Sequence, residues 1–370
     1  MDSDAASSSS DRSGRNSRGI AKSHQQFAPI ELAVVLSHFD IGAIESIKEF
    51  PRGSRRAPKL VIRTEKGAFL LKRRARGKDD PYKVAFAHEL QNYLVARQFP
   101  LPHLVGTTKD NNSMFQNKGR IYELFEYIPG TSFDGTLDAT GDAGKTLGLF
   151  HKLVTDFESE YEEPRGTYHD SEAVRSALDQ VPTMLAQVHS STAADNEQQT
   201  AKTIGFLIES YDEAVEQVND SGLPSWPMKI GHNDWHPGNM LFRSSRVVAV
   251  IDYDAARLQP RVLDMANGVL QFSIVGKGDD PDQWPNHIDV ARFKRFVRGY
   301  DSIPGGMLSR AELRTIPALM TEALIAEAAI PIAATGNFAR LNGFEFLAMA
   351  ERKIQWLQDH SNELVNALDQ

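Results

Sequence analysis

The sequence predicts an α+β protein in which a small antiparallel sheet precedes a mostly helical region. Short apolar segments at 44–50, 59–64 and 69–73 are joined by turn-forming residues, which is typical of an antiparallel meander. A fourth strand is expected at 121–128, where it ends at a Pro-Gly pair. Beyond that pair, long amphipathic segments predict helices almost to the end of the chain.

The length of the chain favours two lobes rather than one core. It has 370 residues, more than a single hydrophobic core usually serves. We expect a disordered tail at 1–24, rich in Ser, Asp, Arg and Gly. An N-terminal lobe should then span 25–128, and a C-terminal lobe should span 129–370, with a hinge where the two meet.

Two helices are expected in the N-terminal lobe. A short one should cover Pro29–His38, and a longer one should begin at Asp80-Pro81 and run to about Phe99. Asp80 suits the N-cap and Pro81 the first helical position. Further helices are expected at Asp142–Phe157, Asp170–Val188, Ala193–Val218, from Arg261 onward, and at Pro285–Tyr300, Ser309–Ala334 and Phe338–Ala367.

Composition narrows the function classes. The chain has no cysteine, which excludes disulfides and cysteine-based zinc sites and fits a reducing cytoplasm. Its formal net charge of −8 argues against a nucleic-acid partner. No apolar run was found near the roughly 18 residues of a membrane helix, so no membrane partner is expected. The oligomeric state stays open.

The segment 231–254 carries the densest set of candidate site residues. It holds Asp234, then Asn239 five positions later, and finally Asp252 and Asp254 after an apolar run. Two short apolar runs joined by Arg-Ser-Ser-Arg predict a β-hairpin with Asn239 at one base and Asp252 at the other. Phosphoryl transfer from ATP uses such groups: a carboxylate orients the hydroxyl, and an amide and a carboxylate hold Mg²⁺.

A lysine and a glutamate of the first lobe could complete this site. Lys72 ends the third strand, and Glu89 shares a helix face with Tyr82, Phe86 and Tyr93. A carboxylate on an aromatic stripe needs a partner, and Lys72 is the expected one. A surface glutamate beside a surface lysine is the alternative.

Together these motifs resemble the aminoglycoside phosphotransferase and choline kinase superfamily, the small-molecule relatives of protein kinases. The resemblance covers about Ala28 to Trp356. It depends on His232–Asn239 (HNDWHPGN) and on Val250–Asp254 (VIDYD) followed by Asp264-Met265-Ala266. It implies a two-lobed protein-kinase-like fold, and an ATP- and Mg²⁺-dependent kinase that phosphorylates a hydroxyl group of a small molecule.

The resemblance also implies roles for residues of the second lobe. Asp234 would orient the hydroxyl nucleophile, and Asn239 and Asp252 would bind Mg²⁺. Asp254 would be an auxiliary metal carboxylate or a turn residue. His232 would support the loop by packing and hydrogen bonding. Asp264 would brace it through hydrogen bonds.

Further roles follow for the first lobe and the hinge. Lys72 would contact the α- and β-phosphates while Glu89 holds it in place. Backbone groups of Glu126, Tyr127 and Ile128 would bind adenine.

Two departures from the family pattern bear on function. Asn233 stands where many relatives have glycine, and Asn tolerates left-handed backbone well. The loop 51–58 contains one glycine and is no Gly-x-Gly-x-x-Gly loop, which argues against a protein kinase. A non-catalytic kinase-like binding or scaffold protein, as among spore-coat relatives, stays an alternative.

The acceptor is not fixed by the sequence. Amino-alcohols, homoserine-like compounds and aminoglycosides all remain open. Residues in the regions that would contact it are Trp235, His236, Trp284, Glu322 and Glu327.

Overall fold

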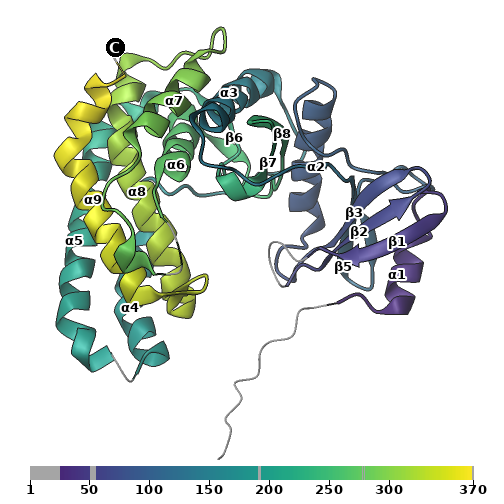
Figure 1. Ribbon diagram of the computed structural model, residues 1–370, viewed down its shortest axis with the longest axis horizontal. Coiled ribbons are helices and arrows are strands. Elements are labelled where there is room, and N and C mark those ends of the chain that lie inside the picture. Colours follow the sequence, from purple (N-terminus) through teal and green to yellow (C-terminus); the bar gives the residue numbers. More distant parts are fainter. Residues whose placement is uncertain (1–25, 51–55, 191–192, 277, 279, 369–370) are drawn as a thin grey trace, which may run out of the picture.

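The computed structural model describes residues 26–50, 56–190, 193–276, 278 and 280–368. The expected tail at 1–24 and part of the loop at 51–58 lie outside these residues. Figure 1 shows a sheet-containing part at one end of the long axis and a large helical part at the other, with α2 (Pro81–Val95) between them. The expected α+β, two-lobed fold is therefore confirmed.

The sheet of the first lobe has five strands in the order β1-β2-β3-β5-β4, all antiparallel. The strands are β1 (Ile44–Glu49), β2 (Lys59–Thr64), β3 (Gly67–Arg73), β4 (Phe115–Asn117) and β5 (Arg120–Glu126). Alternate residues of β2 and β3 are buried, and Ile62 and Leu71 among them pack in one cluster with residues of α1 (Pro29–Leu36) and its following turn. The short edge strand β4 was not predicted, because three residues are too few for a periodic signal.

Helix α2 begins as the sequence predicts, with the Asp80 side chain accepting a hydrogen bond from the Tyr82 N–H. Its buried side chains, including Phe86 and Leu90, belong to the same core as the helices of the second lobe. Phe157 of that lobe makes an edge contact with Phe86. The boundary between the lobes is thus bridged by α2 rather than being a clean gap.

The second lobe is built on packed helices. These are α3 (Leu137–Leu153), α4 (Glu172–Val188), α5 (Ala193–Asp220), α6 (Arg261–Ser273), α7 (Val290–Asp301), α8 (Arg310–Thr335) and α9 (Gly343–Asn366). The short 3₁₀ turns are η1 (Val154–Asp156), η2 (Leu223–Ser225), η3 (Pro237–Asn239) and η4 (Pro281–Gln283). Helix α3 lies so close to α7 that a Cβ on Gly144 would stand 2.1 Å from the Phe296 carbonyl oxygen. Glycine is therefore required at that crossing.

Some helix starts differ from the prediction because the capping residues decide them. Helix α3 starts earlier, with the Thr136 side chain as its cap, and α7 starts later, capped by Asp289. Helix α9 starts later because β10 (Asn337–Phe338) and β11 (Leu341–Asn342) form a small hairpin before it.

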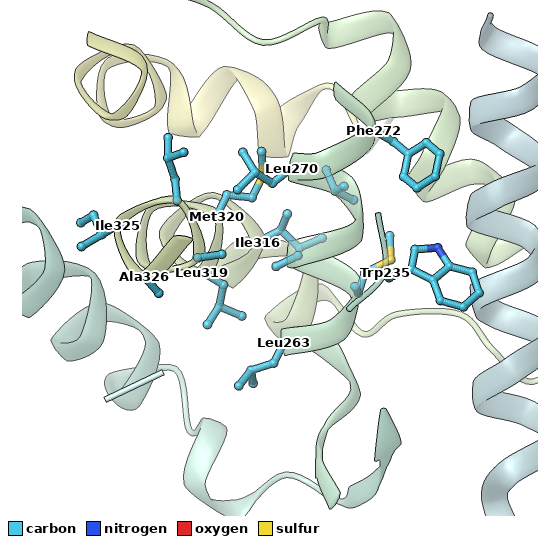
Figure 2. Close-up of a cluster of buried hydrophobic side chains, with 14 of the residues drawn as sticks. Trp235, Leu263, Leu270, Phe272, Ile316, Leu319, Met320, Ile325 and Ala326 are labelled. Carbon is cyan, nitrogen blue, oxygen red and sulfur yellow. The ribbon is translucent and has the colours of Figure 1, made fainter. Parts of the chain in front are cut away.

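The central helix of this core is α8. Its side chains Ile316, Leu319 and Met320 pack with Leu263 and Leu270 of α6, and Trp235 lies at the edge of the same cluster (Figure 2). By length and apolar composition α8 could cross a membrane, so the expectation that no segment had this character was wrong. Since 83% of its most apolar window is buried inside the protein, packing against neighbouring helices accounts for that composition.

Candidate active site

The predicted hairpin is present and brings two candidate metal ligands together. Strands β7 (Met240–Arg243) and β8 (Arg246–Val250) pair antiparallel. Both turn residues, Ser244 and Ser245, have positive φ, the conformation that favours two-residue hairpins. The N–H of Ile251 donates to the carbonyl of Asn239 at 3.0 Å. Asn239 therefore lies beside the end of β8, next to Asp252.

Asp234 is oriented and accessible. The Asn239 amide donates to the Asp234 carboxylate at 2.7 Å and to its backbone carbonyl at 3.0 Å. The Asp234 side chain is still 44% exposed, with the His236 ring 3.5 Å away. A fixed carboxylate open to solvent is suited to accept a hydrogen bond from an incoming hydroxyl.

Asp252 is exposed at the end of the hairpin and has a φ of 67°. Non-glycine residues rarely adopt this left-handed region, and such strain is concentrated at functional sites. Burial is the largest influence on two lysines of the first lobe: it lowers the pKa of Lys59 and opposes the raised pKa of Lys72. The Asp252 carboxylate is among the charges that favour the protonated form of both lysines. The carboxylate thus faces the basic residues of the first lobe.

The donor set fits a magnesium ion that is shared with a nucleotide. The Asn239 NH₂ group is used by Asp234, which leaves the amide oxygen as a donor beside the Asp252 carboxylate. Mg²⁺ takes oxygen ligands and commonly uses one or two protein groups, with phosphates and water completing its shell. Among the described residues, no group of three or more His, Asp or Glu side chains could hold a metal without such help.

Asp254 does not fit the expected role of an auxiliary metal ligand. Its two carboxylate oxygens accept from Arg74 at 2.8 and 3.0 Å. Burial opposes its charge, but Lys72 and Arg74 outweigh that effect and lower the pKa of Asp254. This carboxylate links the lobes through Arg74, so its oxygens are engaged in an ion pair.

Asp264 holds the loop that carries Asp234. It is fully buried at the start of α6, and it accepts from the N–H groups of His232 at 2.6 Å and Asn233 at 2.9 Å. His151 contacts the same carboxylate at 3.1 Å and the Tyr300 hydroxyl at 2.8 Å. His151 is thus a packed helix residue.

The His232 side chain supports the loop by packing. Its ring makes edge contacts with Tyr253 and Trp235, and neither ring nitrogen has a hydrogen-bond partner in the described part of the chain. The hydrogen bond that His232 contributes to the loop is that of its backbone N–H to Asp264. Burial lowers the pKa of His232. The neighbouring Asn233 has a φ of 63°, which explains why a residue tolerant of left-handed backbone stands there.

We expect Asp264→Ala to lower the free energy of unfolding by on the order of 3 kcal/mol, because two buried N–H groups lose their acceptor. Urea denaturation of the purified variant measures this loss. The matched control is Asp359→Ala on the exposed side of α9, which should stay within about 0.5 kcal/mol of the parent. Equal stability of the two variants would contradict the bracing role.

The expected pair of Lys72 and Glu89 is not formed. Lys72 lies 3.5 Å from Glu123 of β5, whereas Glu89 accepts a hydrogen bond from the Ser159 hydroxyl. Burial opposes the charge of Lys72, but Glu123 outweighs it and the pKa of Lys72 is raised. Glu89 is therefore turned toward the second lobe, and the prediction that it holds Lys72 was wrong.

Sequence reasoning missed the charged residues around Glu123. Its carboxylate accepts from Arg74 and contacts His88, both at 2.7 Å. Glu123 is the register partner of Lys72 across β3 and β5. Both strands had been predicted, so testing every antiparallel register for opposite charges could have found the pair.

Lys59 is a second missed lysine. It is the register partner of Lys72 across β2 and β3, so the two side chains leave the sheet on the same face. Burial and the charge of Lys72 lower the pKa of Lys59, while Asp252 acts in the opposite direction. The two lysines form one basic surface opposite Asp252.

The expected hinge residues differ in the groups that they can offer. The N–H of Glu126 donates to the His103 carbonyl and that of Tyr127 to the Ala68 carbonyl, both at 2.9 Å. Among the described residues, the Ile128 N–H has no hydrogen-bond partner. Of these three N–H groups, that of Ile128 is the one left for a ligand.

The residues expected near the acceptor divide into two kinds. Trp235 is fully buried in the core, and Glu322 is buried against His169 at 2.9 Å, so both are structural. Glu327 is only partly buried and accepts from Gln271 of α6. Burial raises the pKa of Glu327 to about 7, and the charge of Asp234 also raises it. Glu327 is therefore close enough to Asp234 to be affected by its charge.

Known structures share this fold. An aminoglycoside phosphotransferase from Alicyclobacillus acidocaldarius aligns with a TM-score of 0.66 at 17% identity, covering 94% of this chain and 98% of the other. A microcompartment-associated aminopropanol kinase aligns at 0.64 and 15%, covering 90% and 98%. An amicoumacin kinase, solved with AMP-PNP, Ca²⁺ and its ligand, aligns at 0.63 and 14%, covering 90% and 94%.

Sequence comparison identifies the family. No curated protein matches this chain. The family model described as the phosphotransferase enzyme family matches residues 46–314, most of the chain. The resemblance seen in the sequence is thus confirmed, and so is the expected enzyme class, an ATP-dependent kinase with an alcohol group as acceptor. The chain belongs to the phosphotransferase enzyme family.

Proposed function

We propose that this protein transfers the γ-phosphoryl group of ATP to a hydroxyl group of a small molecule and that Asp234 orients that hydroxyl. The supporting observation is the accessible Asp234 carboxylate, which the Asn239 amide holds at 2.7 Å beside the base of the hairpin. A loose phosphoryl-transfer transition state requires chiefly that the nucleophile be held in line.

On the nucleotide side, Lys72 would hold the α- and β-phosphates, and the N–H of Ile128 would bind adenine. Asn239 and Asp252 would hold Mg²⁺, which neutralises charge on the transferring phosphoryl group. The Asn239 side-chain oxygen, which accepts no hydrogen bond from the residues that the structure describes, and the exposed Asp252 carboxylate support this role. We also propose that the boundary between the two lobes lies between Ile128 and Pro129.

On the acceptor side, we favour a hydroxyl compound that carries an amine. Glu327 and Gln271 supply an anionic and a polar group on α8 and α6, close enough to Asp234 for its charge to affect Glu327. A carboxylate there would pair with an ammonium group of the acceptor. The aminopropanol and aminoglycoside kinases among the similar structures act on compounds of this kind, as their names state.

A panel of hydroxyl acceptors tests the proposal. ADP release would be followed with MgATP and aminopropanol, ethanolamine, choline, homoserine, aminoglycosides and uncharged sugar alcohols. We expect turnover with at least one amine-bearing acceptor and none with the Asp234→Ala variant. Stabilisation by MgATP without turnover of any acceptor would instead favour the non-catalytic, kinase-like alternative.

The KM of an amine-bearing acceptor should depend on pH through the ionisation of Glu327. With a pKa of about 7, its ionised fraction rises between pH 6 and pH 8, so binding of a cationic acceptor should tighten as the pH rises. We expect the KM of the amine-bearing acceptor to fall roughly tenfold over this range. Glu327→Gln should give a high KM that changes little with pH. If the KM of the Glu327→Gln variant falls with pH as the KM of the parent does, Glu327 does not belong to the acceptor site.

A further inference from the structure

Glu123 occupies a central position in the charged cluster of the first lobe. It lies on β5 with none of its side chain exposed, and three basic side chains surround it. Burial alone would raise its pKa, but Lys72 and Arg74, with a hydrogen bond from His88, hold the pKa of Glu123 well below its usual range. The carboxylate is therefore ionised at neutral pH.

The two oxygens of this carboxylate have different partners. Oε1 receives Arg74 and His88, both at 2.7 Å, and these contacts fix the plane of the group. Oε2 faces the Lys72 ammonium at 3.5 Å and has no hydrogen-bond partner in the described residues. Two fixed contacts on one oxygen thus direct the other toward Lys72.

Glu89 is already engaged with the second lobe. It is bound to Ser159 of the second lobe, and the α2 side chains on either side of it, Phe86 and Leu90, are buried in the large helical core. Close packing makes rotation of such a helix costly. Glu123 needs no movement, because it is already the cross-strand neighbour of Lys72.

We propose that Glu123, held by Arg74 and His88, is the positioning residue that directs Lys72 toward the phosphates of ATP. The inference depends on the proposed function, since it assigns Lys72 to the nucleotide. In this chain a strand residue would thus do what the resemblance assigned to the helix residue Glu89.

A double-mutant cycle tests this directly. ATP affinity and kcat/KM for ATP would be measured for Glu123→Gln and Glu89→Gln, each in the parent and in a Lys72→Met background. We expect Glu123→Gln to lower kcat/KM for ATP by about 10- to 100-fold in the parent, with little change in the acceptor KM. In the Lys72→Met background, Glu123→Gln should lower kcat/KM for ATP by less than about a further twofold, because Lys72, the partner of Glu123, is already absent.

Glu89→Gln should change kcat/KM for ATP by the same factor in the parent and in the Lys72→Met background, because Glu89 is not coupled to Lys72. Glu45→Gln on the exposed face of β1 is the neutral control. If Glu123→Gln does not fold, Glu123→Asp replaces it. The shorter side chain keeps the charge for Arg74 and His88 but withdraws from Lys72, and we expect weaker ATP binding with little loss of thermal stability.

Two results would overturn the inference: coupling of Lys72 to Glu89 instead of Glu123, or equal effects of Glu123→Gln with and without Lys72. A merely structural glutamate would lower the melting temperature and act equally in both backgrounds. Failure of the proposed function looks different, because the parent protein itself would then release no ADP with any acceptor, whether or not it binds MgATP.

Discussion

Asp234→Ala should reduce phosphoryl transfer by about 10²- to 10⁴-fold, the range for loss of a positioned proton acceptor. The Asp234 carboxylate is held by the Asn239 amide and is open to solvent, so the substitution removes the group proposed to orient the hydroxyl. The measurement is ADP release under single-turnover conditions with the best acceptor of the panel.

The same variant should still bind MgATP, because Asp234 is assigned to the hydroxyl and not to the nucleotide. Its thermal stabilisation by MgATP should match that of the parent, which separates loss of chemistry from loss of folding. Turnover at the parent rate would remove Asp234 from the role of orienting the nucleophile.

Asp252→Asn should abolish both turnover and the stabilisation by MgATP, with a loss of at least about 100-fold in kcat/KM. Asn is preferred to Ala here because the backbone φ of 67° suits Asn, so the substitution removes charge without adding strain. Thermal shifts with ATP, measured over a series of Mg²⁺ concentrations, would show whether the variant needs more Mg²⁺ than the parent for the same stabilisation.

The matched control is Asp282→Asn, an exposed carboxylate paired with Arg352 in the helical lobe. It carries the same charge change and should bind MgATP as the parent does. If the thermal stabilisation of Asp252→Asn by MgATP depends on Mg²⁺ as that of the parent does, Asp252 is not a Mg²⁺ ligand. The left-handed backbone at this position would then need another explanation.

The part of the site that the sequence predicted well is local in the chain. Asp234, Asn239 and Asp252 lie within twenty residues and are arranged by one loop and one hairpin, so short-range turn chemistry is enough to bring them together. The hydrogen bonds by which Asp264 braces that loop span only about thirty residues of the chain, from His232 and Asn233 to the start of α6.

The partner of Lys72 could not be predicted in this way. The helix-face argument placed Glu89 on an aromatic stripe, but Tyr82 of that stripe is 72% exposed, and the buried face of α2 packs on the second lobe instead. Which carboxylate meets Lys72 depends on the register of β3 with β5. Because α2 and β4 separate β3 from β5 in the chain, no hairpin turn fixes their register, and the alternation of apolar residues fixes only which face of the sheet each side chain takes.

The acceptor region shows the same limit. Glu322 and Glu327 are five positions apart on one helix and look alike in the sequence, yet one is buried with His169 and the other contacts Gln271. The distinction comes from the loop that carries His169, which the helical pattern of α8 does not encode.

Lys59 of β2 and Lys72 of β3 are opposed in the sheet, so the charge of a bound ligand should affect the stability of the whole first lobe. Two like charges on directly opposed residues repel each other in the sheet, and burial of Lys59 adds to that cost. A polyanion bound between the lobes would cancel the repulsion, so ligand charge and folding become thermodynamically linked. The sheet should therefore gain more protection from hydrogen exchange with ATP than with ADP, and least with AMP. Adenine binding alone, without phosphate, should leave the sheet nearly as it was.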